Sequence, residues 1–388
     1  MSEKYYKRAY KYRLYPTDEQ KILFAHQFGC CRYVYNWALR MRIDMYYKQG
    51  KRLYYADTCL ALTSLKQQPE TAWLQEVVAI PLQQSLRHVD KAFLNFFEGR
   101  AKHPTFKKKG NQQSATYAGN SFTLRGTVLT LSKMDTPLDI HWSRPLPKDC
   151  KPSSITITKD EANRYFVSIL VEEDIQPLPI VNKMMGLDLG LKSMVITSDG
   201  HTYGNPKFFA QDEKKIARLE RKKAKKKKGS KNRNKARLKV ARAYKKVVDR
   251  RRDYQHKLST KIIHENQVVC VESLQVKNMV KNHCLAKAIE DVGWSEFVRQ
   301  LEYKATWYGR TLVKIDKWYP SSKRCNACGH ILESLTLDIR SWTCPECGTH
   351  HDRDINAAKN VLAAGLAVLA CGEAVRPGRV KTQSGKPR

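Results

Sequence analysis

The sequence predicts a multidomain α/β protein, in which a β-barrel-like unit interrupted by helices precedes an α/β domain with a mixed sheet. Three observations support this prediction. The chain of 388 residues is long enough for two or three domains, each with its own core. Residues 8–15 and 104–180 contain short alternating runs that indicate strands, and helical patterning dominates between them. From residue 184 onward strands alternate with helices.

The composition indicates a globular protein that binds a polyanion. Its hydrophobic content of 41% and aromatic content of 10% exclude a wholly disordered chain. Lysine and arginine number 71 against 37 acidic residues, which gives a formal charge of +34. Such a chain repels itself unless a polyanion compensates the charge. Nucleic acid is the expected partner, and no membrane partner is expected because no strongly amphipathic anchor is present.

The same features predict a soluble, cytoplasmic protein. The first residues, MSEKYYKRAYKYRLYP, are charged throughout and lack the apolar core of a secretory signal. The longest apolar stretch, 361–372, is shorter than the roughly 20 residues of a membrane span. We interpret it as the buried end of a helix that begins near Asp354. Of the 11 cysteines, four form two close pairs and the others are scattered, as in a reducing compartment with one metal site.

The first strand and the helical insert follow from local patterns. Tyr10, Tyr12 and Leu14 alternate with basic residues, which predicts a short strand over 8–15 with one basic face. Thr17 followed by Gln20 predicts a capping box that opens the helical region. Two apolar stripes are expected there, formed by Ile22, Leu23, Phe24, Phe28 and Tyr33 and by Leu82, Leu86, Val89, Phe93, Phe96 and Phe97.

Residues 104–180 predict the β-barrel-like unit, which the strand over 8–15 is expected to join. One hairpin is expected around Arg125-Gly126 and another around Asp160–Asn163. The following segment, 177–183, has the composition of a linker.

The α/β domain begins with GLDLGLKSMVITSDG, which predicts two strands and a Ser-Asp-Gly turn. Residues 214–252 hold 21 lysines and arginines with only two acidic residues, and Gly229-Ser230 is expected to break them into a helical hairpin. QVVCVES and TLVKIDKWY predict buried strands. The region after residue 372 is basic and rich in proline and glycine, which predicts a disordered tail.

The basic hairpin is the main candidate for nucleic-acid binding. Lysines that neutralise phosphates release counterions, which gives affinity without sequence preference. A second basic strip covers residues 100–109. Base-reading side chains in the helical insert include Gln83, Tyr54 and Lys66 as weaker candidates. The expected contacts are Lys222, Lys223, Lys226, Lys227, Arg233, Arg237, Lys107, Lys108, Gln84 and Arg87. Tyr244 and Tyr254 either stack on bases or pack against protein, and packing is favoured.

Three carboxylates are the candidate catalytic residues. Asp188 lies in a strand of apolar character, where an unpaired carboxylate is costly, and Glu272 closes another such strand. Either acid alone is more commonly a solvated residue at a strand end. In an RNase H-like strand order, however, they would converge and hold two Mg²⁺ ions, the arrangement that hydrolyses phosphodiesters.

The third carboxylate comes from Asp352 or Asp354. Asp354 enters the first turn of the helical run Ile355-Asn356-Ala357-Ala358 and would project back toward the sheet, so we assign Asp354. Asp352 is better explained as a helix cap or as a residue that orients the site, and Asn356 is a further candidate for the latter.

A zinc ribbon is predicted from two Cys-x-x-Cys pairs separated by fifteen residues. The predicted ligands are Cys325, Cys328, Cys344 and Cys347, and a glycine follows each pair, where a tight turn needs a small residue. Four thiolates leave no open coordination position, so the expected role of the zinc is structural.

With these motifs placed, the chain resembles TnpB, the family of RNA-guided nucleases encoded by bacterial insertion sequences and related to type V CRISPR effectors. The resemblance covers nearly the whole length. It rests on the order of YPTDEQ, YVYNWAL, GLDLGLKS, VESLQVKNM, AIEDVGWSEFVRQLEYKATWYG, PSSKRCNACGH and WTCPECGTHHDRDINAAKN.

The resemblance implies a wedge β-barrel interrupted by a helical recognition domain, followed by a RuvC-like (RNase H-like) nuclease with an inserted zinc ribbon. The implied bounds are 1–16 (first wedge strand), 17–103 (recognition), 104–180 (wedge barrel), 181–320 (nuclease, first part), 321–350 (zinc ribbon), 351–372 (last nuclease helix) and 373–388 (tail). It implies magnesium ligands at Asp188, Glu272 and Asp354 and zinc ligands at the four paired cysteines. The expected partners are a guide RNA from the transposon end and double-stranded target DNA beside a short transposon-adjacent motif, bound by a monomeric ribonucleoprotein.

Two other functions compete with RNA-guided DNA cleavage. A nuclease-inactive RNA-guided regulator of transposition would have lost the carboxylates, which are all present here. A strand-transfer transposase shares the nuclease fold but commonly ends its acidic set with glutamate, whereas the order here is Asp, Glu, Asp. No His-x-His pair that would support tyrosine-mediated nicking is present.

Overall fold

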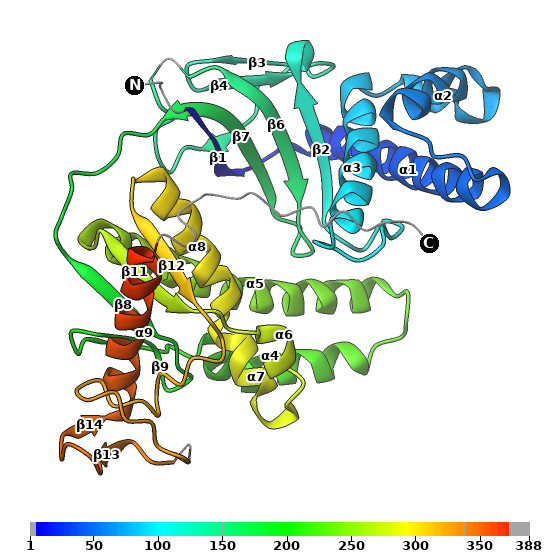
Figure 1. Cartoon of the computed structure of the whole chain (residues 1–388). Helices are drawn as coiled ribbons and strands as arrows, with labels where there is room; N and C mark the ends of the chain where they lie inside the picture. The colour runs from blue at the N-terminus through cyan, green and yellow to red at the C-terminus, as the bar shows by residue number, and fades with distance from the viewer. Residues whose placement is uncertain (1–4, 149, 337, 372–388) are drawn as a thin grey trace. The chain divides into compact units, whose positions relative to one another are not determined.

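A computed structural model of the chain describes residues 5–148, 150–336 and 338–371 (Figure 1). The chain divides into two compact units, Met1–Asp174 and Ile175–Arg388. The division falls just before the linker-like segment 177–183, which contains no helix or strand.

The first unit is built on a five-stranded antiparallel sheet with the order β2-β6-β7-β1-β5. Its strands are β1 (Tyr5–Leu14), β2 (Gln113–Ala118), β5 (Ile140–His141), β6 (Pro152–Lys159) and β7 (Tyr165–Asp174). The first strand pairs along its whole length with β7, from Tyr5↔Asp174 to Leu14↔Tyr165. As predicted, Tyr10, Tyr12 and Leu14 are buried and face the core, whereas Lys11 is exposed.

The predicted hairpins are confirmed, but a closed barrel is not formed by the described strands. Strands β3 (Phe122–Arg125) and β4 (Val128–Leu131) make the hairpin at Arg125-Gly126, and β6 and β7 make the other. Strands β2 and β5 are the two edges of the five-stranded sheet and do not pair with each other, and β3 and β4 form a separate two-stranded sheet. The alternating pattern predicts strands correctly because it depends on local burial, whereas closure depends on long-range pairing that the pattern does not contain.

The helical insert consists of α1 (Asp18–Gln49), α2 (Tyr55–Gln67), the 3₁₀ helix η1 (Pro69–Gln75) and α3 (Ala79–Phe97). The capping box is confirmed: the Gln20 backbone N–H donates to Thr17 Oγ1, and the Thr17 N–H donates to Gln20 Oε1, both at 3.2 Å. The apolar stripes are only partly buried. Ile22 and Phe97 are 70% and 67% exposed, because they lie beyond the helix faces that form the core.

The second unit contains the mixed sheet, with the order β10-β9-β8-β11-β12. Its strands are β8 (Met184–Asp188), β9 (Ser193–Thr197), β10 (Thr202–Gly204), β11 (Val268–Glu272) and β12 (Thr311–Ile315). Strands β8, β11 and β12 are parallel to one another, and β9 and β10 complete the sheet in antiparallel fashion. The two strands and the Ser-Asp-Gly turn predicted for residues 186–200 are therefore confirmed.

Helices cover both faces of this sheet. Val269 and Val271 of β11 join the core formed with α5 (Lys231–Glu265), α7 (His283–Val292) and α8 (Trp294–Trp307). Val268 and Cys270 point to the opposite face and join the core formed with α9 (Arg353–Ala370). The apolar run at 361–371 is the continuation of α9 as predicted, and Figure 1 shows this helix across β8, β11 and β12.

Gly186 permits the close approach of α9 to β8. A Cβ at this position would lie 2.1 Å from the Ala358 carbonyl oxygen and 2.8 Å from the Leu362 nitrogen. Both are backbone atoms, so no side-chain rotation would relieve the clash. Only glycine therefore allows the helix to lie this near the strand that ends in Asp188.

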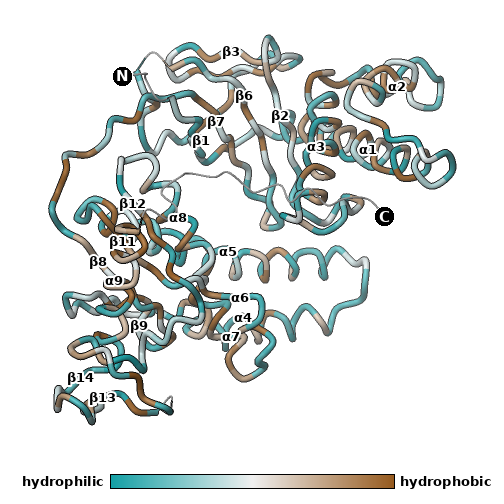
Figure 2. The backbone as a smooth tube through the Cα atoms, in the orientation of Figure 1, coloured by the Kyte–Doolittle hydropathy of each residue, from teal (hydrophilic) through white to brown (hydrophobic). Residues whose placement is uncertain are grey.

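The predicted helical hairpin is confirmed as α4 (Phe208–Ala224) packed against α5. Gly229 adopts φ +81° in the connection, and Ser230 caps α5 by accepting a hydrogen bond from the Arg233 N–H at 3.1 Å. Both arms are largely hydrophilic (Figure 2). The short helix α6 (Val276–Met279) follows β11.

The remaining strands are β13 (Ser341–Thr343) and β14 (His350–Asp352), which pair in the cysteine-containing module. No described helix has the length and apolar content needed to cross a bilayer. The predicted tail after residue 372 lies outside the described residues.

Candidate active site

Asp188 and Glu272 end neighbouring parallel strands. Leu187 is in register with Val271, so Asp188 and Glu272 occupy the next pair of positions on β8 and β11. Adjacent strands are separated by about 4.8 Å. The carboxyl edge of a parallel sheet, where these acids lie, is the usual place for functional groups in α/β folds.

The alternation of side chains places both acids on the face that α9 covers. Asp188 lies two residues beyond Gly186, which faces α9, and Glu272 lies two residues beyond Cys270, which belongs to the α9 core. Asp354 is in the first turn of α9. Asp352 caps the helix: its Oδ1 accepts from the Asp354 N–H at 3.0 Å and from the Ile355 N–H at 2.9 Å. The helix-cap interpretation of Asp352 is thus confirmed.

Glu272 and Asp354 act electrostatically on Asp188. The pKa of Asp188 is raised from 3.8 to about 7, first by burial and then by the charges of Glu272 and Asp354, and Arg353 opposes the rise. Burial also raises the pKa of Glu272, against the effect of its hydrogen bond from Ser321. Arg340 Nη1 lies 3.6 Å from Asp354 Oδ2. Ionisation of Asp188 beside the other two acids is therefore unfavourable, and a hard cation with oxygen ligands would relieve it.

Ser321 is a functional candidate that the sequence did not single out. Its hydroxyl donates a hydrogen bond to Glu272 Oε1, and the residue is 7% exposed. A serine in the loop PSSKRC carries no distinguishing pattern, so only the structure brings it to the carboxylate.

The four paired cysteines form a compact cluster. Their sulfur atoms all lie within 4.8 Å of one another, with 3.7 Å between Cys325 and Cys347 and 3.6 Å between Cys328 and Cys344. A tetrahedral site with zinc–sulfur bonds of ~2.3 Å places its sulfurs about 3.8 Å apart. The two turns match: each glycine N–H, from Gly329 and Gly348, donates to the carbonyl of the first cysteine of its pair at 3.0 Å. The geometry fits a zinc ion.

A polar network joins this module to α9. Asn356 Nδ2 donates to the Arg324 carbonyl at 2.8 Å, and Asn356 Oδ1 accepts from the Asn326 N–H at 3.0 Å. Asn360 Nδ2 donates to the Ser321 carbonyl at 2.8 Å. Asn356, expected to orient the carboxylates, instead fixes the first cysteine turn against the helix that carries Asp354.

The predicted nucleic-acid contacts on the basic hairpin differ in their surroundings. Lys222, Lys226, Lys227 and Arg237 are exposed. Lys223 forms an ion pair with Glu220, and Arg233 Nη1 donates to the Lys226 carbonyl at 2.6 Å. Tyr244 stacks on Phe209 at 6.2 Å between ring centroids, and the Tyr254 hydroxyl donates to the Gly204 carbonyl at 2.7 Å, so both tyrosines pack as expected.

The candidates in the first unit are also partly engaged. Lys107 Nζ lies 4.1 Å from the ring centroid of Tyr35, and burial lowers the pKa of this lysine. The Arg87 guanidinium lies 4.6 Å from the ring centroid of Tyr55. Lys108 is exposed and Gln84 is partly exposed. Their roles as contacts stay predictions.

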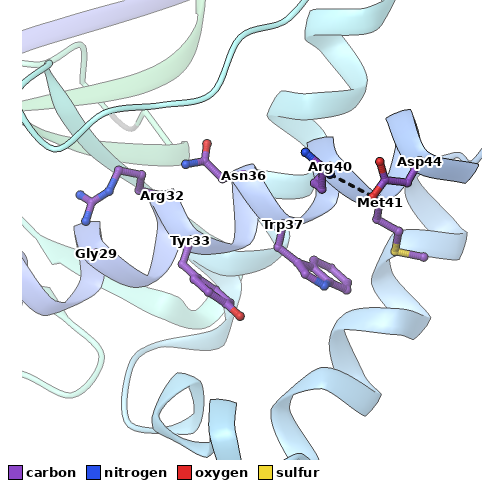
Figure 3. Close-up of a pocket in the computed structure, with 8 residues that line it drawn as sticks. All are labelled: Gly29, Arg32, Tyr33, Asn36, Trp37, Arg40, Met41 and Asp44. Atoms are coloured by element: carbon purple, nitrogen blue, oxygen red, sulfur yellow. Dashed lines mark hydrogen bonds and ion pairs between the residues drawn. The ribbon is translucent and has the colours of Figure 1, made fainter. Parts of the chain in front are cut away.

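A cavity of about 610 Å³ lies on α1 of the first unit and contains none of the candidate carboxylates (Figure 3). Its charged groups and its asparagine are already paired within the protein. Arg40 Nε donates to Asp44 at 2.9 Å, Arg32 donates to Gln113 at 2.7 Å, and Asn36 bonds the Lys107 backbone. We therefore do not assign it as the catalytic site.

Comparison with protein families gives three matches. Residues 1–51 match a helix-turn-helix domain of the IS605 OrfB type, residues 167–283 match the IS605 OrfB model described as "Probable transposase", and residues 294–361 match the Cas12f1-like TNB domain. The last match contains the cysteine cluster and Asp354.

Known relatives match almost end to end. A Streptomyces pristinaespiralis protein named "Putative RNA-guided DNA endonuclease" is 49% identical over 98% of this chain and 94% of its own length. The Escherichia coli K12 protein InsQ, named in the same way, is 32% identical over 96% of both chains. The structure is also similar in fold to Cas12f1 in its complex with sgRNA and target DNA, with a TM-score of 0.56, 14% identity and coverage of 92% of this chain and 98% of that one.

Mimivirus proteins named TnpB-like, which are 27% identical over 57% of this chain, belong to the same group of relatives. The chain is similar over almost its whole length to InsQ and to the Streptomyces protein, and it matches the IS605 OrfB models. These similarities place it in the same family as those relatives. The chain belongs to the TnpB family.

Proposed function

We propose that this protein is an RNA-guided DNA endonuclease that hydrolyses phosphodiester bonds with Mg²⁺. The observation that carries the proposal is the position of Asp188 and Glu272 at the ends of neighbouring parallel strands, with Asp354 near enough in the first turn of α9 to raise the pKa of Asp188. The names of the full-length relatives support the guided nuclease function.

The three carboxylates would hold divalent cations, which supply charge stabilisation to the scissile phosphate and lower the pKa of water. The chain's own residues prepare this site. Ser321 holds one oxygen of Glu272, leaving the other free to bind a cation. Burial of Asp188 removes competing water and strengthens its attraction for positive charge. Asp352 fixes the first turn of α9 and thereby the position of Asp354.

The remainder of the chain would hold nucleic acid. We assign residues 1–16 and 104–180 to the wedge and residues 17–103 to recognition. The RuvC-like nuclease would occupy residues 181–320 and 351–372, with the zinc module at 321–350. The hairpin α4–α5 would track phosphates of a guide–target duplex, whose base pairing supplies sequence choice. Cas12f1, which has the same fold, is known in complex with sgRNA and target DNA. A guide from the transposon end, a motif beside the target and a monomeric ribonucleoprotein complete the proposal.

A nuclease-inactive regulator is the alternative, and the presence of all three acids argues against it. The deciding experiment is to sequence the RNA that copurifies with the protein and to incubate the complex with matched DNA carrying a randomised flank. Mg²⁺-dependent cleavage beside one flanking motif is expected, and Asp188→Ala should abolish cleavage while leaving DNA binding largely intact. Cleavage by Asp188→Ala at the wild-type rate would refute the site assignment.

A further inference from the structure

The turn that follows β12 presents an exposed tryptophan at the same sheet edge as the carboxylates. Ile315 is in register with Glu272, and Trp318 lies three residues farther along the chain. The side chain of Trp318 is 80% exposed, whereas Trp294 and Trp342 are 2% and 7% exposed. An exposed indole offers a flat aromatic face on which a nucleic-acid base can stack.

The turn holds Trp318 in place relative to the site. The Trp318 N–H donates to Asp316 Oδ1 at 2.7 Å, and the Tyr319 N–H donates to the Asp316 carbonyl at 3.3 Å. Ser321 follows, with its N–H bonded to the Tyr319 carbonyl at 2.8 Å and its hydroxyl bonded to Glu272. A continuous run of hydrogen bonds therefore joins the tryptophan turn to a catalytic carboxylate.

A cavity of about 360 Å³ is lined by Lys317, by the segment that begins at Glu272 and by residues of α8. Glu272 and three cationic side chains, Arg299, Lys314 and Lys317, contribute to its lining. Arg299 and Lys314 are ion-paired with acidic residues of α8. Lys317, by contrast, has no acidic partner among the described residues, and its Nζ lies 4.9 Å from the centroid of the Trp318 ring. Its charge remains available for a phosphate.

We propose that Trp318 and Lys317 form a subsite for one unpaired nucleotide of the DNA strand being cut, with its base on the indole and its phosphate on the ammonium group. Bases within a duplex already stack on one another, so only an unpaired base offers a free face to an exposed indole. Lys317 and Glu272 line the same cavity, so the subsite would lie near one of the carboxylates proposed to hold the cations. This inference rests on the proposed nuclease function.

The test compares Trp318→Ala, Trp318→Phe and the control Ile180→Ala, which removes an equally exposed apolar side chain (84%) from the linker-like segment. Each guide-loaded variant is assayed for cleavage of matched single-stranded DNA. We expect Trp318→Ala to raise KM about 5- to 150-fold, which is the range for the loss of one stacked base. The KM of Trp318→Phe should stay within a few-fold of wild type, and the KM of Ile180→Ala should be unchanged. Guide-RNA affinity should not change in any variant.

A second measurement does not require cleavage. Asp188→Asn protein is mixed with an oligodeoxynucleotide that carries 2-aminopurine near the scissile position, whose fluorescence falls when the base stacks on an indole. Quenching that is lost in Asp188→Asn/Trp318→Ala supports the subsite. A wild-type KM and retained quenching in the alanine variants would overturn it, as would an equal loss of affinity for fully paired DNA. If the wild-type complex cuts nothing, the proposed function fails, and the quenching still decides the subsite.

Discussion

Replacing Asp188 with asparagine should stabilise the metal-free protein, and the gain should depend on pH. The pKa of Asp188 is raised from 3.8 to about 7 in the folded chain, so the folded state prefers the protonated acid. The stability that this preference contributes is fully present below about pH 4 and is lost as the pH rises through about 7. Asparagine has nearly the same shape but does not ionise, so the Asp188→Asn variant does not lose this stability as the pH rises.

The difference between the two pKa values sets the size of the effect. At 1.36 kcal/mol for each pH unit between 3.8 and about 7, ionised Asp188 costs at most about 4 kcal/mol of folding free energy at pH 8. We therefore expect Asp188→Asn to raise the unfolding temperature by several degrees at pH 8 and by much less at pH 5.

Thermal unfolding of nucleic-acid-free protein in magnesium-free buffer at both pH values measures this difference. Asp253→Asn is the matched control, because Asp253 is an exposed acid on α5 whose ion pair with Lys257 contributes little. Added Mg²⁺ should then stabilise wild type and the control more than Asp188→Asn. The reasoning is refuted if Asp188→Asn shifts the unfolding temperature equally at pH 5 and pH 8, or if Mg²⁺ stabilises all three proteins alike.

Four further outcomes are expected. Gly186→Ala should destabilise the second unit by about 1–3 kcal/mol in thermal unfolding because its Cβ meets the α9 backbone, whereas Gly204→Ala, with no atom within 4 Å, should not. Cys328→Ser should lower the zinc content measured by mass spectrometry and the unfolding temperature, and exposed Cys284→Ser should do neither. Ser321→Ala should raise the Mg²⁺ concentration needed for thermal stabilisation, and Ser321→Thr should restore it; no change in either would exclude a positioning role. Glutamine at the four lysines 222, 223, 226 and 227 should reduce the slope of log affinity against log salt by about 3, and an unchanged slope would exclude the hairpin as the phosphate tracker.

The sequence predicts the second unit more fully than the first. Buried parallel strands appear as apolar runs, so β11 and β12 are visible without a structure, and a single acid at the end of such a run stands out. The spacing of the two cysteine pairs is enough by itself to predict a four-cysteine metal site. The open sheet of the first unit was not predicted, because barrel closure depends on which edges pair, and alternation is the same in both cases.

Residues whose role depends on contacts with distant parts of the chain also cannot be recognised from the sequence. Ser321, Asn360 and Gly186 have ordinary neighbours in sequence, and their importance comes from atoms contributed by distant elements. Likewise, Arg233 was assigned to nucleic acid by its charge, although its guanidinium bonds the backbone at the end of α4. Composition identifies a basic surface but does not distinguish the cations that the fold itself uses.

Helix α9 follows the other elements of the proposed site in the sequence, and this order affects how the site is assembled during synthesis. Domains generally fold in order as they leave the ribosome. The sheet, the basic hairpin and two of the acids are therefore made before Asp354, and one sheet face stays uncovered until α9 docks past Gly186. The proposed nucleic-acid-binding hairpin is therefore made before the third proposed cation ligand, so RNA binding would precede completion of the proposed cation site.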